Sequence, residues 1–158
     1  MATTQLNGKT LQELSTFTHR IKLTDADLTE GTDATAQSVT LFNVKAGQQV
    51  RNFAYKVVTA FTEIDAGTNP VVSLTMKVGE GSGAQFAAAA SVLDDVSPVL
   101  YGPAADQASI GKVYTSDTDI KATFTPGAGG ALDEVQNGVI ELYFNVVDID
   151  DTQRESNL

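Results

Sequence analysis

The chain has 158 residues, no cysteine, no tryptophan, one histidine and a net charge of -10 at pH 7. This composition excludes disulfides, cysteine-ligated metal centres and multi-histidine zinc sites, and an acidic balance makes binding to nucleic-acid phosphates unfavourable. The length is most simply that of one domain, which would bury roughly 70% of the surface that its unfolded form exposes.

The chain starts with Met-Ala-Thr-Thr-Gln-Leu, which has neither the basic nor the apolar region of a signal peptide. No apolar run approaches the roughly 18 residues that a membrane span requires. The absence of cysteine fits folding in a reducing cytoplasm. We therefore expect a soluble protein, made in the cytoplasm, that binds neither membranes nor nucleic acid.

Residues 1–16 are expected to form an N-terminal arm with at most one helical turn over 10–14. The segment is polar except for three isolated leucines, Leu6, Leu11 and Leu14. An arm of this kind either frays or finds a partner. Exposed leucines in a polar segment are best explained if another surface, of this chain or of a partner, covers them.

Two strands are expected in the first third of the chain, on either side of a polar connection over 25–36. In 17–24 the side chains alternate in character, so that one face would carry Phe17, His19, Ile21 and Leu23. In 37–44 the same period places Val39 and Leu41 on one face and Phe42 on the other.

The middle of the chain predicts a long strand over 50–61 and an amphipathic strand over 71–78. Apolar residues on both faces of 50–61 indicate a central position in a sheet or a β-bulge. In 71–78 one face would be apolar, formed by Val72, Leu74, Met76 and Val78. After a glycine-rich loop over 79–83, residues 84–90 fit a helix by propensity or a strand by context, and both stay open.

The last third predicts strands over 112–115 and 119–125, a turn at Asn137-Gly138 and a closing strand over 138–150. The closing strand carries the clearest alternation in the chain. Its apolar face is formed by Ile140, Leu142, Phe144 and Val146. The opposite row is Glu141, Tyr143, Asn145 and Val147, which suits a sheet that meets solvent or another subunit.

These elements predict an all-β protein, an antiparallel β-sandwich of about eight strands with jelly-roll-like topology. The expected organisation is an N-terminal arm over 1–16, a β-sandwich domain over 17–150 and a polar C-terminal tail over 151–158.

Several short motifs imitate catalytic or ligand-binding sequences without the required spacing. His19 shares its predicted face with apolar residues, and no Gly-x-Ser-x-Gly elbow exists to supply a nucleophile. Gly8-Lys9-Thr10 lacks the first glycine of a phosphate-binding loop. Asp25-x-Asp27 begins like a calcium loop, but the sixth position is Glu30. We expect no enzyme, no cofactor and no metal site; the acidic run over 148–151 is more simply explained as solvated carboxylates than as a cation site.

The order of the strand patterns resembles tailed-bacteriophage capsid decoration proteins, also called cement proteins. The resemblance rests on 21–28, 37–42, Ala46-Gly47 and 50–61, and continues through 72–79, Gln85-Phe86 and the final strand to Ile149. It covers most of 17–149 and consists of strand patterns and spacing rather than a chemical motif.

The resemblance implies a jelly-roll protein of the virion exterior, often a homotrimer, that clamps subunits of the major capsid protein after the head expands. The residues then expected to contact the partner are Leu6, Leu11, Leu14 and Phe17. An arm that folds back on its own sandwich is an equally open alternative.

Two other functions stay open on the sequence. A tail or fibre component, or another carbohydrate-binding β-sandwich, would be favoured by a groove in which Tyr55, Tyr101 or Tyr114 cluster. An enzyme would need a cleft that brings carboxylates to His19, and is the least favoured interpretation.

Overall fold

The computed structural model of the chain describes residues 17–64, 70–93, 100–101 and 111–149. The arm leucines Leu6, Leu11 and Leu14, the helical turn expected over 10–14 and the tail over 151–158 lie outside these residues.

The described residues form ten strands and two short 3-10 helices. The strands are β1 (His19–Thr24), β2 (Gln37–Val44), β3 (Gln48–Thr59), β4 (Thr62–Glu63), β5 (Leu74–Glu80), β6 (Ala87–Ser91), β7 (Leu100–Tyr101), β8 (Thr118–Pro126), β9 (Val135–Gln136) and β10 (Val139–Asp148). The helices are η1 (Asp25–Asp27) and η2 (Leu132–Glu134).

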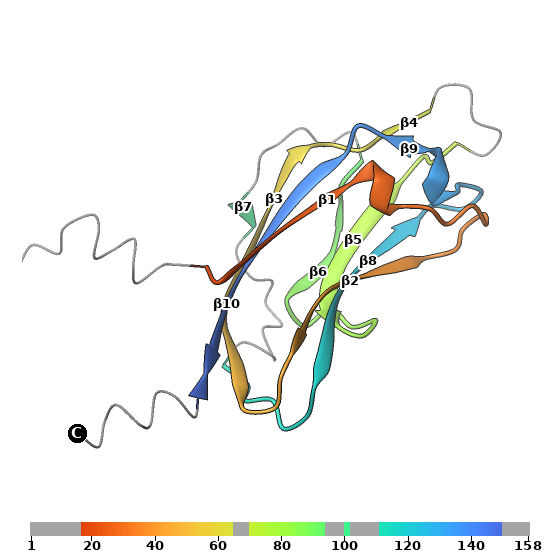
Figure 1. Cartoon of the computed structure of the whole chain (residues 1–158). Coiled ribbons are helices and arrows are strands. Elements are labelled where there is room, and N and C mark those ends of the chain that lie inside the picture. Colours follow the sequence, from red (N-terminus) through yellow and green to blue (C-terminus); the bar gives the residue numbers. More distant parts are fainter. Residues whose placement is uncertain (1–16, 65–69, 94–99, 102–110, 150–158) are drawn as a thin grey trace, which may run out of the picture.

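Eight of the strands form a sandwich of two four-stranded sheets (Figure 1). The order in one sheet is β1-β10-β3-β7 and in the other β2-β8-β5-β6, and all pairings within them are antiparallel. Counted among these eight strands alone, the orders are 1-8-3-6 and 2-7-4-5, which is jelly-roll topology. The predicted all-β sandwich is confirmed. β4 and β9 pair separately as a two-stranded ribbon.

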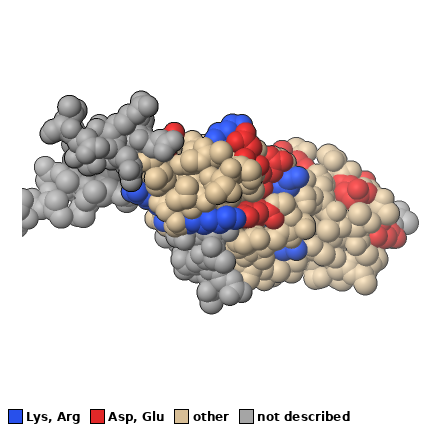
Figure 2. Space-filling view, turned by 90° about the horizontal axis from the view of Figure 1, so that it is seen from below, with Lys and Arg blue, Asp and Glu red and all other residues tan. Residues whose placement is uncertain are grey.

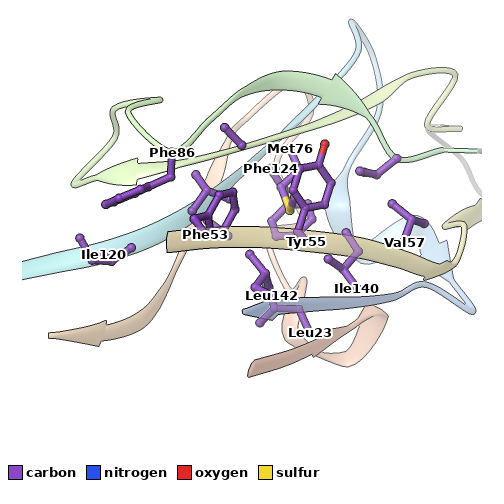
Figure 3. Close-up of a cluster of buried hydrophobic side chains, with 14 of the residues drawn as sticks. Leu23, Phe53, Tyr55, Val57, Met76, Phe86, Ile120, Phe124, Ile140 and Leu142 are labelled. Carbon is purple, nitrogen blue, oxygen red and sulfur yellow. The ribbon is translucent and has the colours of Figure 1, made fainter. Parts of the chain in front are cut away.

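The core lies between the inward faces of the two sheets, where side chains from both interdigitate (Figure 3). Its aromatic centre is Phe144 of β10, which is fully buried and whose ring lies 4.8 Å from those of Phe42 and Phe53. The alternation predicted for the closing strand is confirmed, since Ile140, Leu142, Phe144 and Val146 are all buried.

The long third strand has both features that its sequence indicated. β3 lies between β10 and β7, so it is central in its sheet. Its register with β10 also shifts at two points, one of which sets Val58 outside the pairing and 46% exposed. Residues 84–90, which fit either a helix or a strand by sequence, contribute the start of strand β6.

Three sequence predictions are wrong in detail. The pairing of β2 with β8 shifts between Thr40 and Phe42, and this bulge brings Phe42 into contact with the core after Val39. Val72 is 72% exposed because β5 begins only at Leu74. Residues 112–115 form no strand; Val113 makes a single bridge to Gln49.

Close packing explains the turn before the closing strand. Asn137 has a φ of 64°, the left-handed conformation that asparagine tolerates. A Cβ on Gly138 would overlap the ring of Phe61, so only glycine fits there. The turn predicted at Asn137-Gly138 thus starts β10 against a buried aromatic side chain.

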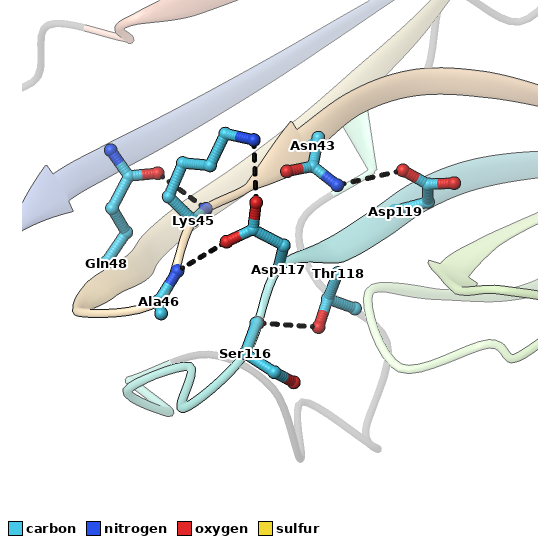
Figure 4. Close-up of polar contacts among 8 residues, drawn as sticks. All are labelled: Asn43, Lys45, Ala46, Gln48, Ser116, Asp117, Thr118 and Asp119. Atoms are coloured by element: carbon cyan, nitrogen blue, oxygen red, sulfur yellow. Dashed lines mark hydrogen bonds and ion pairs between the residues drawn. The ribbon is translucent and has the colours of Figure 1, made fainter.

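At the opposite end of the sandwich, Asp117 fastens the β2–β3 turn to the start of β8 (Figure 4). Its carboxylate accepts hydrogen bonds from Lys45 Nζ at 2.8 Å and from the backbone N–H of Ala46 at 3.1 Å. The Lys45 ammonium and that N–H lower the pKa of Asp117.

Candidate interaction surface

The two sheets present outward faces of different chemistry. We call one the Tyr143 face; it is the outward side of the β1-β10-β3-β7 sheet and comprises Arg20, Lys22, Ala54, Lys56, Glu141, Tyr143, Asn145 and Val147. We call the other the threonine face; it is the outward side of the β2-β8-β5-β6 sheet and comprises Ser38, Thr40, Asn43, Thr75, Lys77, Asp119, Lys121, Thr123 and Thr125.

Arg20, Glu141 and Tyr143 form a polar network at the centre of the Tyr143 face. Arg20 of β1 donates to the Glu141 carboxylate at 2.8 Å, and the hydroxyl of Tyr143 donates to the other oxygen of the same carboxylate. The Arg20 guanidinium also lies 5.7 Å from the centre of the Tyr143 ring. Three side chains from two neighbouring strands therefore hold one another in place.

This network shifts the titration of its members. The Tyr143 hydroxyl, and after it the Arg20 guanidinium, lower the pKa of the Glu141 carboxyl. The same hydrogen bond to Glu141 raises the pKa of Tyr143. At neutral pH the three groups therefore present a fixed anion, cation and phenol rather than a proton donor with a pKa near 7.

Phe17 lies against the Tyr143 face, contrary to the prediction that it shares a side with His19. Its ring centre is 5.4 Å from that of Tyr143, at an angle of 49°. The alternation fails because β1 begins only at His19. Phe17, the first residue that the structure describes, therefore has its ring on the side of Tyr143.

Two further residues on the Tyr143 face are more buried than the solvated side of a sheet requires. Ala54 is only 8% exposed although it lies beside Tyr143 in the neighbouring strand. The side-chain oxygen of Asn145 is buried and has no hydrogen-bond partner within the described part of the chain. A buried acceptor without a donor is costly, so Asn145 lowers the stability of the fold at this position.

Polar side chains of the threonine face form hydrogen bonds with one another. Ser38 and Thr123 share a hydrogen bond of 2.8 Å, and Asn43 donates to Asp119 at 3.0 Å. Thr123 is 5% exposed despite pointing outward. None of its members is aromatic, and hydroxyl groups of this kind are well hydrated.

Uncharged residues form most of the surface seen in Figure 2, and Lys and Arg lie beside Asp and Glu in the middle of the view. The right-hand part of the view in Figure 2 shows Asp and Glu but no Lys or Arg. No basic stripe of the kind that tracks a phosphate backbone is visible on this side.

Of the four residues predicted to contact a partner, Phe17 is the one that the structure describes. Sequence reasoning did not connect it with Arg20, Tyr143 and Glu141, which the sheet brings together. The sequence did contain a signal for this cluster. The outward row of the closing strand and the basic residues Arg20 and Lys22 of 17–24 become neighbours once the two strands pair.

His19 packs in the sandwich rather than facing a cleft. Its ring stacks on Phe42 with centres 4.7 Å apart, and its Nδ1 lies 2.9 Å from the hydroxyl oxygen of Thr18. Within the described residues, no three His, Cys, Asp or Glu side chains gather in a way that could hold a metal ion. Asp27, singled out for a calcium loop, instead accepts a hydrogen bond from the backbone N–H of Thr24 at 2.8 Å and caps η1.

Two of the three tyrosines that would line a sugar-binding groove are buried. Tyr55 is 3% exposed and Tyr114 is 2% exposed. The Tyr114 hydroxyl donates to Glu80 at 2.9 Å. The side chain of Tyr101 lies outside the described residues, so the groove that would favour carbohydrate recognition has no described member.

Among the described residues, no helix has the length and apolar character needed to cross a membrane.

Comparison with known proteins gives one structural similarity. No protein family and no curated protein matches the chain in sequence. The fold is similar to a chain in the acidic stable capsid structure of Helicobacter pylori bacteriophage KHP30, at 17% identity and a TM-score of 0.37, covering 82% of this chain and 97% of that one.

Proposed function

We propose that the protein is a structural component of a phage virion, which binds the outer surface of the expanded head and stabilises it by bridging subunits of the major capsid protein. The Tyr143 face, together with residues 1–16, would form the contact. Support comes from the strand patterns that resemble decoration proteins and from the jelly-roll topology of the sandwich.

The observation that carries the proposal is the meeting of Phe17, Tyr143 and Arg20 at the point where residues 1–16 join the sandwich. Interface hot spots are enriched in tyrosine and arginine. Tyr143 is fixed by Glu141, so little side-chain freedom is lost when a partner covers it.

Binding of this kind would stabilise the head by mass action. A protein that binds the closed shell, but not its dissociated subunits, adds interface that must be lost before the shell opens. If three copies associate, as the resemblance implies, their linked contacts act at a high effective concentration. Weak single contacts would then be sufficient.

The test is to titrate purified protein onto expanded empty heads and to measure both binding and the temperature at which the heads break. We expect saturable binding and a higher disruption temperature. Absence of binding to expanded heads would refute the proposal. Heads that have not expanded serve as the matched control and should bind less.

The predicted role of the arm has its own test, which is deletion of residues 1–15. We expect weaker head binding from loss of Leu6, Leu11 and Leu14, and an unchanged circular dichroism spectrum because the sandwich core is intact. Unchanged affinity would mean that the arm does not contact the head.

A further inference from the structure

The edge strand β2 is the feature that the proposed function leaves unused. β2 pairs with β8 alone among the described strands, so its other side presents backbone N–H and C=O groups without a strand partner there. It is eight residues long. An edge of this length is a template for another strand unless the protein blocks it.

The two edges on this side of the sandwich differ in how they are protected. β1 carries Arg20 and Lys22, and charged side chains, lysine above all, discourage pairing between edges. β2 reads Gln-Ser-Val-Thr-Leu-Phe-Asn-Val and contains neither a charge nor a proline. The bulge after Thr40 is its one blocking feature.

An apolar seam runs between these two edges. Within the described ranges, the half-buried hydrophobic residues that pack against the core come from β1 and β2: Ile21, Val39, Leu41 and Phe42. His19 stacks on Phe42 across the same seam. A strand added to β2 would cover this apolar surface, which supplies a hydrophobic gain besides the backbone hydrogen bonds.

The parts of the chain outside the described residues do not have the sequence of such a strand. An added strand needs apolar residues at alternate positions to cover the seam. In 1–16 the leucines stand at 6, 11 and 14, and 150–158 is polar up to its last residue. The internal segments 65–69 and 94–99 also lack the alternation, and 102–110 has it only at Ala108 and Ile110, too short to cover the seam. β2 itself does have apolar residues at 39 and 41, followed by Phe42 and Val44.

We propose that β2 is a self-association edge, at which β2 of one copy pairs antiparallel with β2 of a second copy. The contact is two-fold and joins two four-stranded sheets into one of eight strands. Because β2 carries no charge, no antiparallel register within 37–44 places like charges opposite each other. The inference goes beyond the proposed function and does not depend on it; where the homotrimer implied by the resemblance forms, the two-fold pair joins two trimers into a particle of six copies.

The experiment is sedimentation equilibrium of the whole chain and of the variant Thr40→Lys. Thr40 lies near the middle of β2 on the exposed side, so a two-fold pair brings the two introduced lysines close together. We expect the wild-type particle to contain an even number of copies, and the substitution to halve its mass by raising the dissociation constant at least tenfold. A single or odd number of copies, or an unchanged mass for Thr40→Lys, would overturn the proposal.

Thr125→Lys is the matched control, because Thr125 is exposed on the same face but lies on β8, which has neighbours on both sides. It should leave the mass unchanged, and an equal loss of mass would show that charge on the face, not the edge, is responsible.

Amide hydrogen exchange of the unaltered protein gives a second readout that does not require a variant to fold. Protection of β2 amides should fall on dilution. Protection that is independent of concentration, and that disappears when residues 1–15 are deleted, would mean that the chain's own arm covers the edge, and would also overturn the proposal.

Discussion

The Tyr143 face and the threonine face are the outward sides of two sheets that share one core, yet they differ in what they leave for a partner. On the Tyr143 face an aromatic side chain is fixed in place by Glu141 and Arg20. On the threonine face the hydroxyl groups of Ser38 and Thr123 form a hydrogen bond with each other.

Strand alternation alone therefore does not distinguish a solvated face from a binding face. Both outward rows are polar by composition. What separates them is the fixed aromatic cluster at the point where residues 1–16 meet Phe17. Substitutions in the shared core and on each of the two faces can test that separation.

The greatest loss should come from Phe144→Ala, which removes the core that both faces share. Phe144 is fully buried and its ring contacts Phe42, Phe53 and Phe86. Truncation of a buried phenylalanine typically costs about 3–5 kcal/mol. Urea unfolding should show this loss, and a cost below about 1 kcal/mol would mean that the two sheets do not pack through this aromatic cluster.

The difference between the faces is tested by Tyr143→Asp, with Thr125→Asp as the control on the threonine face. If Tyr143 is a hot spot, its loss should cost about 2 kcal/mol of binding, which is roughly 30-fold in affinity for expanded heads. Thr125→Asp should bind as the wild type does. Equal weakening by both substitutions would show that added negative charge, and not the Tyr143 face, controls binding.

A smaller effect is expected from Ser38→Ala on the threonine face. The substitution removes the 2.8 Å hydrogen bond to the buried Thr123 hydroxyl. A net loss of about 1 kcal/mol in the free energy of unfolding follows from the usual value of one such bond. Head binding should not change, and weakened binding would assign a function to the threonine face.

The weakest effect concerns pH. The folded pKa of Glu141 is lowered, first by the Tyr143 hydroxyl and then by Arg20, from its usual value of 4.5. A group with a lowered pKa stabilises the fold above its unfolded pKa, and this contribution is lost as the pH falls through the folded pKa. Below about pH 4.5 the wild type should therefore lose slightly more stability than Glu141→Gln, as measured by urea unfolding at pH 7 and pH 3. Identical losses would mean that the network is not formed in solution.

Much of the sandwich could be predicted from the sequence because most of its strands have one buried face. The alternation of β10 predicted its buried row correctly. The apolar residues on both faces of β3 indicated a central position or a bulge, and β3 has both. β2 was less readable: a bulge changes the period at one residue, and no local pattern marks it. Val72 was assigned to the core because the apolar period continues beyond the true start of β5.

The candidate site was less predictable because it depends on pairing between distant segments. Arg20 and Glu141 are far apart in sequence and meet only because β1 lies beside β10. The sequence alternation places Phe17 on the same face as His19. In the structure its ring lies on the opposite face, because β1 begins only at His19. The contribution of Leu6, Leu11 and Leu14 stays a prediction.

A direct test of which face binds the head uses the absence of cysteine from the chain. Single cysteines can be introduced as Lys56→Cys on the Tyr143 face and Thr125→Cys on the threonine face, and their rates of maleimide labelling compared for free and head-bound protein. We predict that binding slows labelling at position 56 at least tenfold and leaves position 125 unchanged. Unchanged labelling at 56, or protection at 125 instead, would mean that the Tyr143 face is not the surface that binds the head.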